Sequence, residues 1–136
     1  MRVVHVASEA APFAQSGGLA DVVAGLPAAL AESHGLDVGV VVPLYRGVAE
    51  KLAARSIALT PGDAIAITVG PHELQGVLRI ARVGRVAYGF VDIPALFDRA
   101  GTLYGPGGVL SAVPEPGAWA LMAVGLLVLS RRRLSA

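Results

Sequence analysis

Two adjacent glycines, Gly17 and Gly18, stand where a short apolar segment gives way to an amphipathic one. A glycine pair here lets the backbone pass close to a ligand, and the free N–H groups of a following helix then face an anion. That geometry suits a diphosphate. The pair equally fits a tight turn in which Ser16 caps the helix. Because the segment has neither the lysine of a P-loop nor a G-x-G-x-x-G pattern, both interpretations stay open.

The acidic side chains do not define a catalytic pair. Glu9, Asp92 and Asp98 could serve as acid and base, but caps, turns and surface positions account for them equally well. We therefore assign no catalytic residue.

The histidines do not define a metal site either. His5 is predicted to be a packed residue of a strand, His34 lies near a helix end, and His72 lies in a turn. No two have the spacing of metal ligands, so no metal and no cofactor are predicted. The absence of cysteine excludes disulfides, thiolate zinc sites and cysteine nucleophiles.

The elements that must position the glycine pair follow from hydrophobic periodicity. Residues 3–7 and 37–45 predict buried strands, and residues 19–34 predict a helix between them. This strand-helix-strand order is typical of parallel sheets. Pro27 is expected to kink the helix or to mark its weak point. The helix is expected to bury one apolar stripe: Leu19, Val22, Val23, Leu26 and Leu30.

A second group of short runs follows a helical turn over residues 47–54. The runs "AIAITVG", "LQGVLRIARV" and "RVAYGFVDI" are separated by "GPHE" and "GR", which predicts three antiparallel strands joined by tight turns. Glycine and proline then become frequent, so regular structure is expected to stop near Arg99. The fold class is α/β.

Composition limits the function further. The chain has 136 residues, which suits one small domain or part of a larger one, and 54% of them are apolar. Its formal net charge is +1 and it contains a single lysine. Nothing in its body is basic enough to follow a nucleic-acid backbone, so we exclude nucleic acid as a partner.

The longer string around the glycines, "VVHVASEAAPFAQSGGLADVVAGLPAAL", resembles the start of the bacterial glycogen synthase and plant starch synthase family. "VVVPLY" resembles the family's second strand, and "GFVDIPALFDRAGTLYG" resembles its aspartate-proline stretch. The resemblance covers about residues 2–107. The positions that fit are Ser8, Glu9, Pro12, Ser16, Gly17, Gly18, Leu19, Asp21 and Pro27, then Asp92, Pro94, Phe97, Asp98, Arg99, Gly101, Tyr104 and Gly105.

The resemblance implies a retaining glucosyltransferase that moves glucose from ADP-glucose to the non-reducing end of an α-1,4-glucan. It implies a GT-B fold, in which two Rossmann-like domains face a cleft, with residues 1–107 as the incomplete start of the first domain. ADP-glucose is then the donor substrate. By the same resemblance, the donor-binding residues are Gln15, Gly17, Gly18 and Asp21.

Two departures from the family bear on activity. The family has a lysine where this chain has Gln15, so the positive charge that would strengthen a hydrogen bond to the diphosphate of ADP-glucose is lost. The family's arginine, lysine and glutamate for the leaving diphosphate lie on the second domain, beyond these residues. Since stabilising that charge is usually the largest catalytic contribution, we expect little turnover from this chain alone.

The C-terminal segment has a different character. Pro114, Glu115 and Pro116 precede an uncharged apolar run from Ala118 to Ser130, and three arginines follow. This pattern resembles the PEP-CTERM sorting tail of exported bacterial proteins, which implies a membrane helix and an exosortase-type processing enzyme. The arginines Arg131, Arg132 and Arg133 fit its cytoplasmic cluster. A packed terminal helix is the alternative.

The two resemblances imply different locations. The first implies the cytoplasm. The second implies membrane association through residues 118–130 after export, although no secretory signal opens the sequence. A fusion or truncation after about Gly107 would reconcile them, with a glycine-rich linker over 108–113 and a tail over 114–136. The alternative function is a non-catalytic, membrane-attached surface protein defined by its tail. An incomplete sheet is also expected to leave an apolar edge that promotes self-association.

Overall fold

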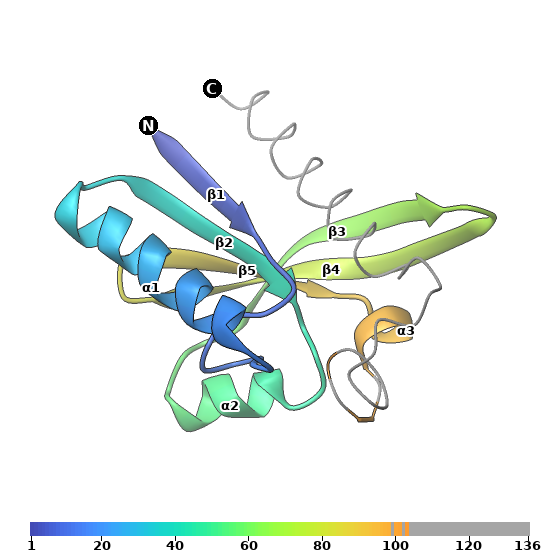
Figure 1. Cartoon of the computed structure of the whole chain (residues 1–136). Helices are drawn as coiled ribbons and strands as arrows, with labels where there is room; N and C mark the ends of the chain where they lie inside the picture. Colours follow the sequence, from blue (N-terminus) through green and yellow to red (C-terminus); the bar gives the residue numbers. More distant parts are fainter. Residues whose placement is uncertain (99, 102, 104–136) are drawn as a thin grey trace.

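A five-stranded sheet organises the chain, and its strands lie in the order β1-β2-β5-β4-β3 (Figure 1). The computed structural model describes residues 1–98, 100, 101 and 103. The expected linker over 108–113 and the tail over 114–136, including its predicted apolar helix, lie outside the described residues.

The first three elements form the predicted strand-helix-strand unit. β1 (Arg2–Val6) is followed by α1 (Gly18–Ser33) and β2 (Asp37–Pro43). β1 pairs with β2 in parallel, with Val4 opposite Gly39. The predicted parallel pair is therefore confirmed, and the helix begins one residue earlier than expected.

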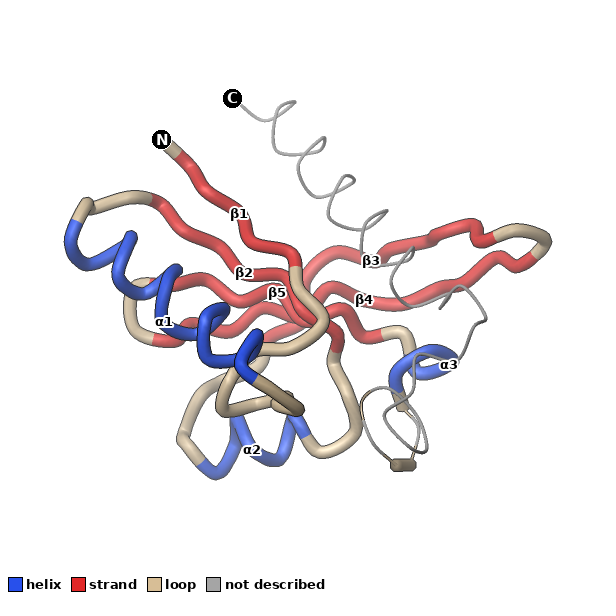
Figure 2. Tube along the Cα trace, in the orientation of Figure 1, coloured by secondary structure: helices blue, strands red, loops and turns tan. Residues whose placement is uncertain are grey.

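The remaining strands form the predicted antiparallel group after α2 (Val48–Ala54). β3 (Thr60–Val69), β4 (His72–Val83) and β5 (Val86–Asp92) pair as successive hairpins. Gly70 and Gly84 both have a φ of +58° at the tight turns, a conformation that glycine adopts without strain. The hairpin of β3 and β4 extends away from α1 and α2 (Figure 2).

The pairing of β5 with β2 joins the two groups into one mixed sheet. These strands run in parallel, with Val41 of β2 opposite Gly89 of β5. β5 is therefore a central strand, flanked by a parallel neighbour on one side and an antiparallel one on the other. The mixed sheet places the segment before α1 above buried residues of β5, where the candidate site lies.

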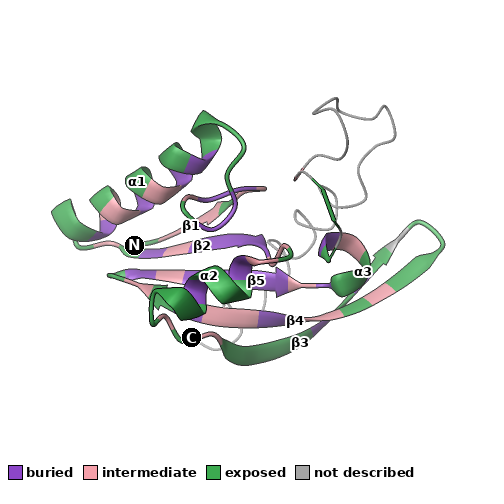
Figure 3. Cartoon of the chain, turned by 90° about the horizontal axis from the view of Figure 1, so that it is seen from below, coloured by how far each residue is buried: buried purple, intermediate pink, exposed green. Residues whose placement is uncertain are grey.

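Most of the residues predicted to form the buried stripe of α1 are exposed, so this prediction is wrong for them. Val23 is buried and Leu30 half-buried, but Leu19, Val22 and Leu26 are 48%, 57% and 47% exposed. The buried positions of the helix, coloured purple in Figure 3, are instead held mainly by small residues, because a helix packed close to a sheet has room only for small side chains. Its buried residues are Ala20, Val23, Pro27 and Ala31.

Two apolar clusters stabilise the sheet. The first joins α1 and α2 to β2 and β5, and Phe90 and Leu52 are fully buried in it. The second joins β2, β3, β4 and β5 to the short helix α3 (Pro94–Phe97), whose Phe97 is buried. Pro27 lies inside α1 without ending it.

Candidate functional site

The glycine pair lies at the start of α1 and faces open space. Gly17 is the N-cap residue, and no side chain caps this helix. A Cβ atom built on Gly17 or Gly18 would meet no atom within 4 Å. The backbone hydrogen bonds of the described loop use Ala10, Ala11, Phe13 and Ala14 rather than the amides of the glycine pair. Gly17, Gly18 and Leu19 are exposed, so the positive end of this 16-residue helix lies at the surface.

Ser16 does not cap the helix, so the predicted serine cap is wrong. Its backbone N–H donates to Oε2 of Glu9 at 2.6 Å, and its hydroxyl lies 3.1 and 3.0 Å from the two carboxylate oxygens. Glu9 is 4% exposed. Ser16 is itself exposed, as are the two glycines, but its N–H and hydroxyl are engaged by the buried Glu9 carboxylate.

Gln15 and Asp21, the other two predicted donor-binding residues, lie together. Nε2 of Gln15 donates to Oδ1 of Asp21 at 3.2 Å, and both residues are exposed. Asp21 lies in the first turn of α1. The structure thus gathers Gln15, the glycine pair and Asp21 around one helix entrance.

The loop before the glycines is held by residues that the sequence did not single out. Phe13 is 2% exposed and makes edge-to-face ring contacts with Tyr88 and Phe90, at centroid distances of 5.7 and 5.8 Å. Nζ of Lys51, on α2, donates to the Phe13 carbonyl oxygen at 2.8 Å. Burial raises the pKa of the Tyr88 phenol above its usual value. Lys51 is 38 residues away in the chain, and nothing in the sequence around it indicates this contact.

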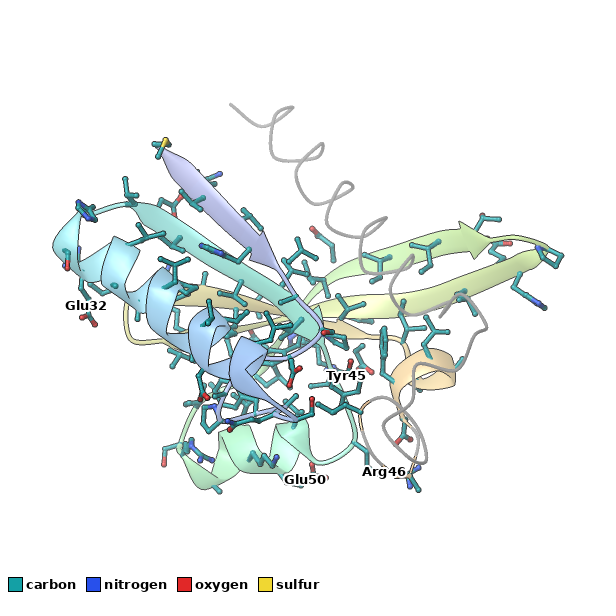
Figure 4. All side chains as sticks on the ribbon, viewed as in Figure 1. Glu32, Tyr45, Arg46 and Glu50 are labelled. Atoms are coloured by element: carbon teal, nitrogen blue, oxygen red, sulfur yellow. The ribbon has the colours of Figure 1, made fainter. Side chains whose placement is uncertain are left out.

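The acidic residues weighed as a catalytic pair have separate structural partners. Asp92 accepts a hydrogen bond from Nε of Arg79 at 2.6 Å. Asp98 accepts one from Nε of Arg46, labelled in Figure 4, at 2.8 Å. Both contacts are ion pairs, and the one between Arg79 and Asp92 joins the neighbouring strands β4 and β5.

The histidines lie apart from the loop. His5 is half-buried on β1, and its Nε2 has no hydrogen-bond partner among the described residues. His34 caps the C-terminus of α1, as expected, whereas His72 begins β4. In the described part of the chain, no three His, Asp or Glu side chains are grouped to hold a metal. No helix there is long and apolar enough to cross a membrane.

Comparison with protein families gives a match to the starch synthase catalytic domain over residues 2–121. The chain belongs to this family. It is similar to the N-terminal part of that domain, which confirms the resemblance found in the sequence. Residues 112–133 match the PEP-CTERM protein-sorting motif.

Curated relatives show how much of the family the chain represents. It is 39% identical over 109 residues to glycogen synthase of Yersinia pestis (strain Pestoides F). It is 38% identical over 108 residues to glycogen synthase of Yersinia enterocolitica (serotype O:8 / biotype 1B, strain NCTC 13174 / 8081). Each alignment covers 76% of this chain and 20% of the relative. The chain therefore spans about a fifth of their length.

A solved structure of the starch synthase family has the same arrangement. The catalytic domain of starch synthase IV from Arabidopsis thaliana, bound to ADP and acarbose, superposes with a TM-score of 0.61 and 29% identity. The match covers 78% of this chain and 21% of that one. The mixed α/β sheet is therefore that of a starch synthase catalytic domain.

Proposed function

We propose that this chain is the donor-binding start of a glycogen or starch synthase and that it binds ADP-glucose at the entrance of α1. In this proposal residues 1–107 form the incomplete, Rossmann-like N-terminal domain of a GT-B enzyme. The complete enzyme would transfer glucose from ADP-glucose to the non-reducing end of an α-1,4-glucan. The observation that carries the proposal is the open space beside Gly17 and Gly18 in a chain of this family.

The chemistry of the loop supports a diphosphate ligand. First-turn amides donate hydrogen bonds, and the helix dipole favours negative charge at this end. Gln15 adds a neutral donor but no positive charge. Asp21 brings a carboxylate close to the same place, so a hydroxyl of the donor's sugar is a better partner for it than a phosphate.

Binding and catalysis separate in this proposal. Residues 1–136 by themselves are expected to bind the donor without transferring glucose, because they carry no described cation beside the loop except Lys51, which donates to Phe13. Incorporation of labelled glucose into glycogen is expected only when the remaining portion of a glycogen synthase is added as a second polypeptide.

Calorimetry with ADP-glucose on the purified chain tests the proposal. Gly18→Val is expected to weaken binding at least tenfold, since its side chain would occupy the space that the diphosphate needs, while the fold stays intact. Gly25→Val is the matched control, because it makes the same change on the same helix where a Cβ also meets open space. Absence of binding by the unmodified chain, or equal losses in both variants, would overturn it.

A second candidate function rests on the match of residues 112–133 to the PEP-CTERM motif. It is a non-catalytic surface protein that an exosortase-type enzyme processes and that attaches to the membrane through residues 118–130. The residues proposed to be recognised are Pro114, Glu115 and Pro116, with Arg131, Arg132 and Arg133 on the cytoplasmic side. Recovery in the membrane fraction should then disappear when residues 114–136 are deleted; unchanged recovery would exclude this function.

A further inference from the structure

We infer that Glu9 is a positioning residue that keeps Ser16 away from the first-turn amides of α1 and so leaves them free for the donor's diphosphate. This inference rests on the proposed function. Glu9 is the buried charged residue of the described part of the chain, at 4% exposure. A buried carboxylate is costly unless donors satisfy it, so its place beneath this loop calls for an explanation.

The hydrogen bonds of Glu9 set the course of the backbone before the glycines. Its Oε2 accepts from the N–H of Ser16 at 2.6 Å. Because a peptide unit is planar, fixing this N–H toward the interior also fixes the plane that joins Gln15 to Ser16. The chain then enters Gly17 in an extended conformation, with φ of −162° and ψ of −164°.

The hydroxyl of Ser16 is a potential competitor for the ligand. Serine is among the best helix N-caps, and it acts by accepting hydrogen bonds from first-turn N–H groups. Ser16 lies one residue before the N-cap Gly17. If the helix began one residue earlier, the serine oxygen would satisfy the amides of Gly18 and Leu19. The bonds from its hydroxyl to Glu9, at 3.1 and 3.0 Å, hold that oxygen elsewhere.

The charge of Glu9 and its positioning role predict opposite changes in ADP-glucose affinity for the variant Glu9→Gln. Removing a negative charge beneath an anion site would, by electrostatics alone, strengthen binding of ADP-glucose. Loss of the positioning contact would release Ser16 to cap the helix and would weaken binding. We expect about fivefold weaker binding, or about 1 kcal/mol, measured by calorimetry.

A rescue experiment separates positioning from general support of the fold. Ser16→Ala removes the competing hydroxyl, so Glu9→Gln combined with Ser16→Ala should recover most of the lost affinity. A residue that only stabilised the fold would give no such recovery. Glu50→Gln is the matched control, since Glu50 lies exposed on α2 (Figure 4) and its change removes the same charge.

Amide hydrogen exchange by NMR tests the inference without any ligand. In the unmodified chain the amides of Gly18 and Leu19 should exchange fast and that of Ser16 slowly. Glu9→Gln should slow exchange at Gly18 and Leu19, and the double variant should reverse this. If the chain fails to bind ADP-glucose but shows this pattern, the proposed function fails and the positioning role stands.

Three results would overturn the positioning role. They are unchanged exchange in Glu9→Gln, tighter or equal ADP-glucose binding in that variant, and absence of rescue by Ser16→Ala. If Glu9→Gln does not fold, amide hydrogen exchange in the unmodified chain decides by itself. Equal protection of the Ser16 and Gly18 amides from exchange would then contradict the inference.

Discussion

Replacing Gln15 by lysine should strengthen ADP-glucose binding, because it adds a cation beside the first-turn amides. The side-chain amide of Gln15 is an uncharged donor, and its Nε2 lies 3.2 Å from Oδ1 of Asp21. A lysine ammonium would add a Coulomb attraction to the diphosphate, and an exposed ion pair is typically worth about 0.2–1 kcal/mol. The exchange is therefore worth up to about 1 kcal/mol, or roughly fivefold in affinity.

Asp21 sets the upper limit of that gain. An ammonium at position 15 lies within reach of the Asp21 carboxylate, and an exposed ion pair of this kind is worth under about 1 kcal/mol. The pair would compete with the diphosphate, so the expected gain lies between about twofold and fivefold. It should shrink in 1 M salt, where the screening length falls to about 3 Å.

Calorimetry with ADP-glucose at low and high salt measures both effects. Gln75→Lys provides the matched control, because it adds the same charge at an exposed position of β4. An equal gain in Gln75→Lys would mean that net charge alone attracts the ligand. No gain in Gln15→Lys would show that the diphosphate does not lie beside residue 15, and the reasoning would fail.

Two further predictions concern stability. Burial raises the pKa of Tyr88 above 10.0, so this tyrosine ionises in the unfolded chain before it does in the folded one, and the unfolding free energy falls above that pH. Urea unfolding at pH 8 and at about 10.5 should show a smaller loss of unfolding free energy in Tyr88→Phe than in the unmodified chain. An equal loss in both proteins would contradict this prediction. A Cβ at Gly76 would collide with the backbone oxygen of Asp92. Gly76→Ala should thus lower the unfolding free energy by at least about 1–3 kcal/mol, whereas Gly25→Ala should raise it slightly, and a harmless Gly76→Ala would count against the strand register.

Local sequence patterns predicted most of the elements. Alternating and continuous apolar runs identified the strands, and the turns at Gly70 and Gly84 identified the hairpins. The parallel pairing of β5 with β2 was not predicted, because a strand buried on both faces carries no signal for its neighbour. Which strand lies beside β5 is set by the arrangement of all the strands in the sheet and not by local sequence.

Two errors at α1 have one physical source. Hydropathy ranks Leu19 and Leu26 above Ala20 and Ala31, yet the alanines face the sheet because the available space decides which side chains fit. Likewise, cap preference favoured Ser16, but the buried carboxylate of Glu9 competes for its hydroxyl. Neither the spacing to the sheet nor the position of Glu9 can be obtained from local sequence.

The outward flank of α1, formed by the exposed residues Leu19, Val22 and Leu26, connects assembly with ligand binding. Leu19, which belongs to that flank, follows the glycine pair directly, and it is 48% exposed. In the proposed function, any molecule that shields this flank from water stands next to the bound diphosphate and alters the local dielectric. Thermodynamic reciprocity then requires that ADP-glucose and the covering molecule change each other's affinity by one common factor. If a second copy of this chain is the covering molecule, the apparent dissociation constant for ADP-glucose varies with the protein concentration.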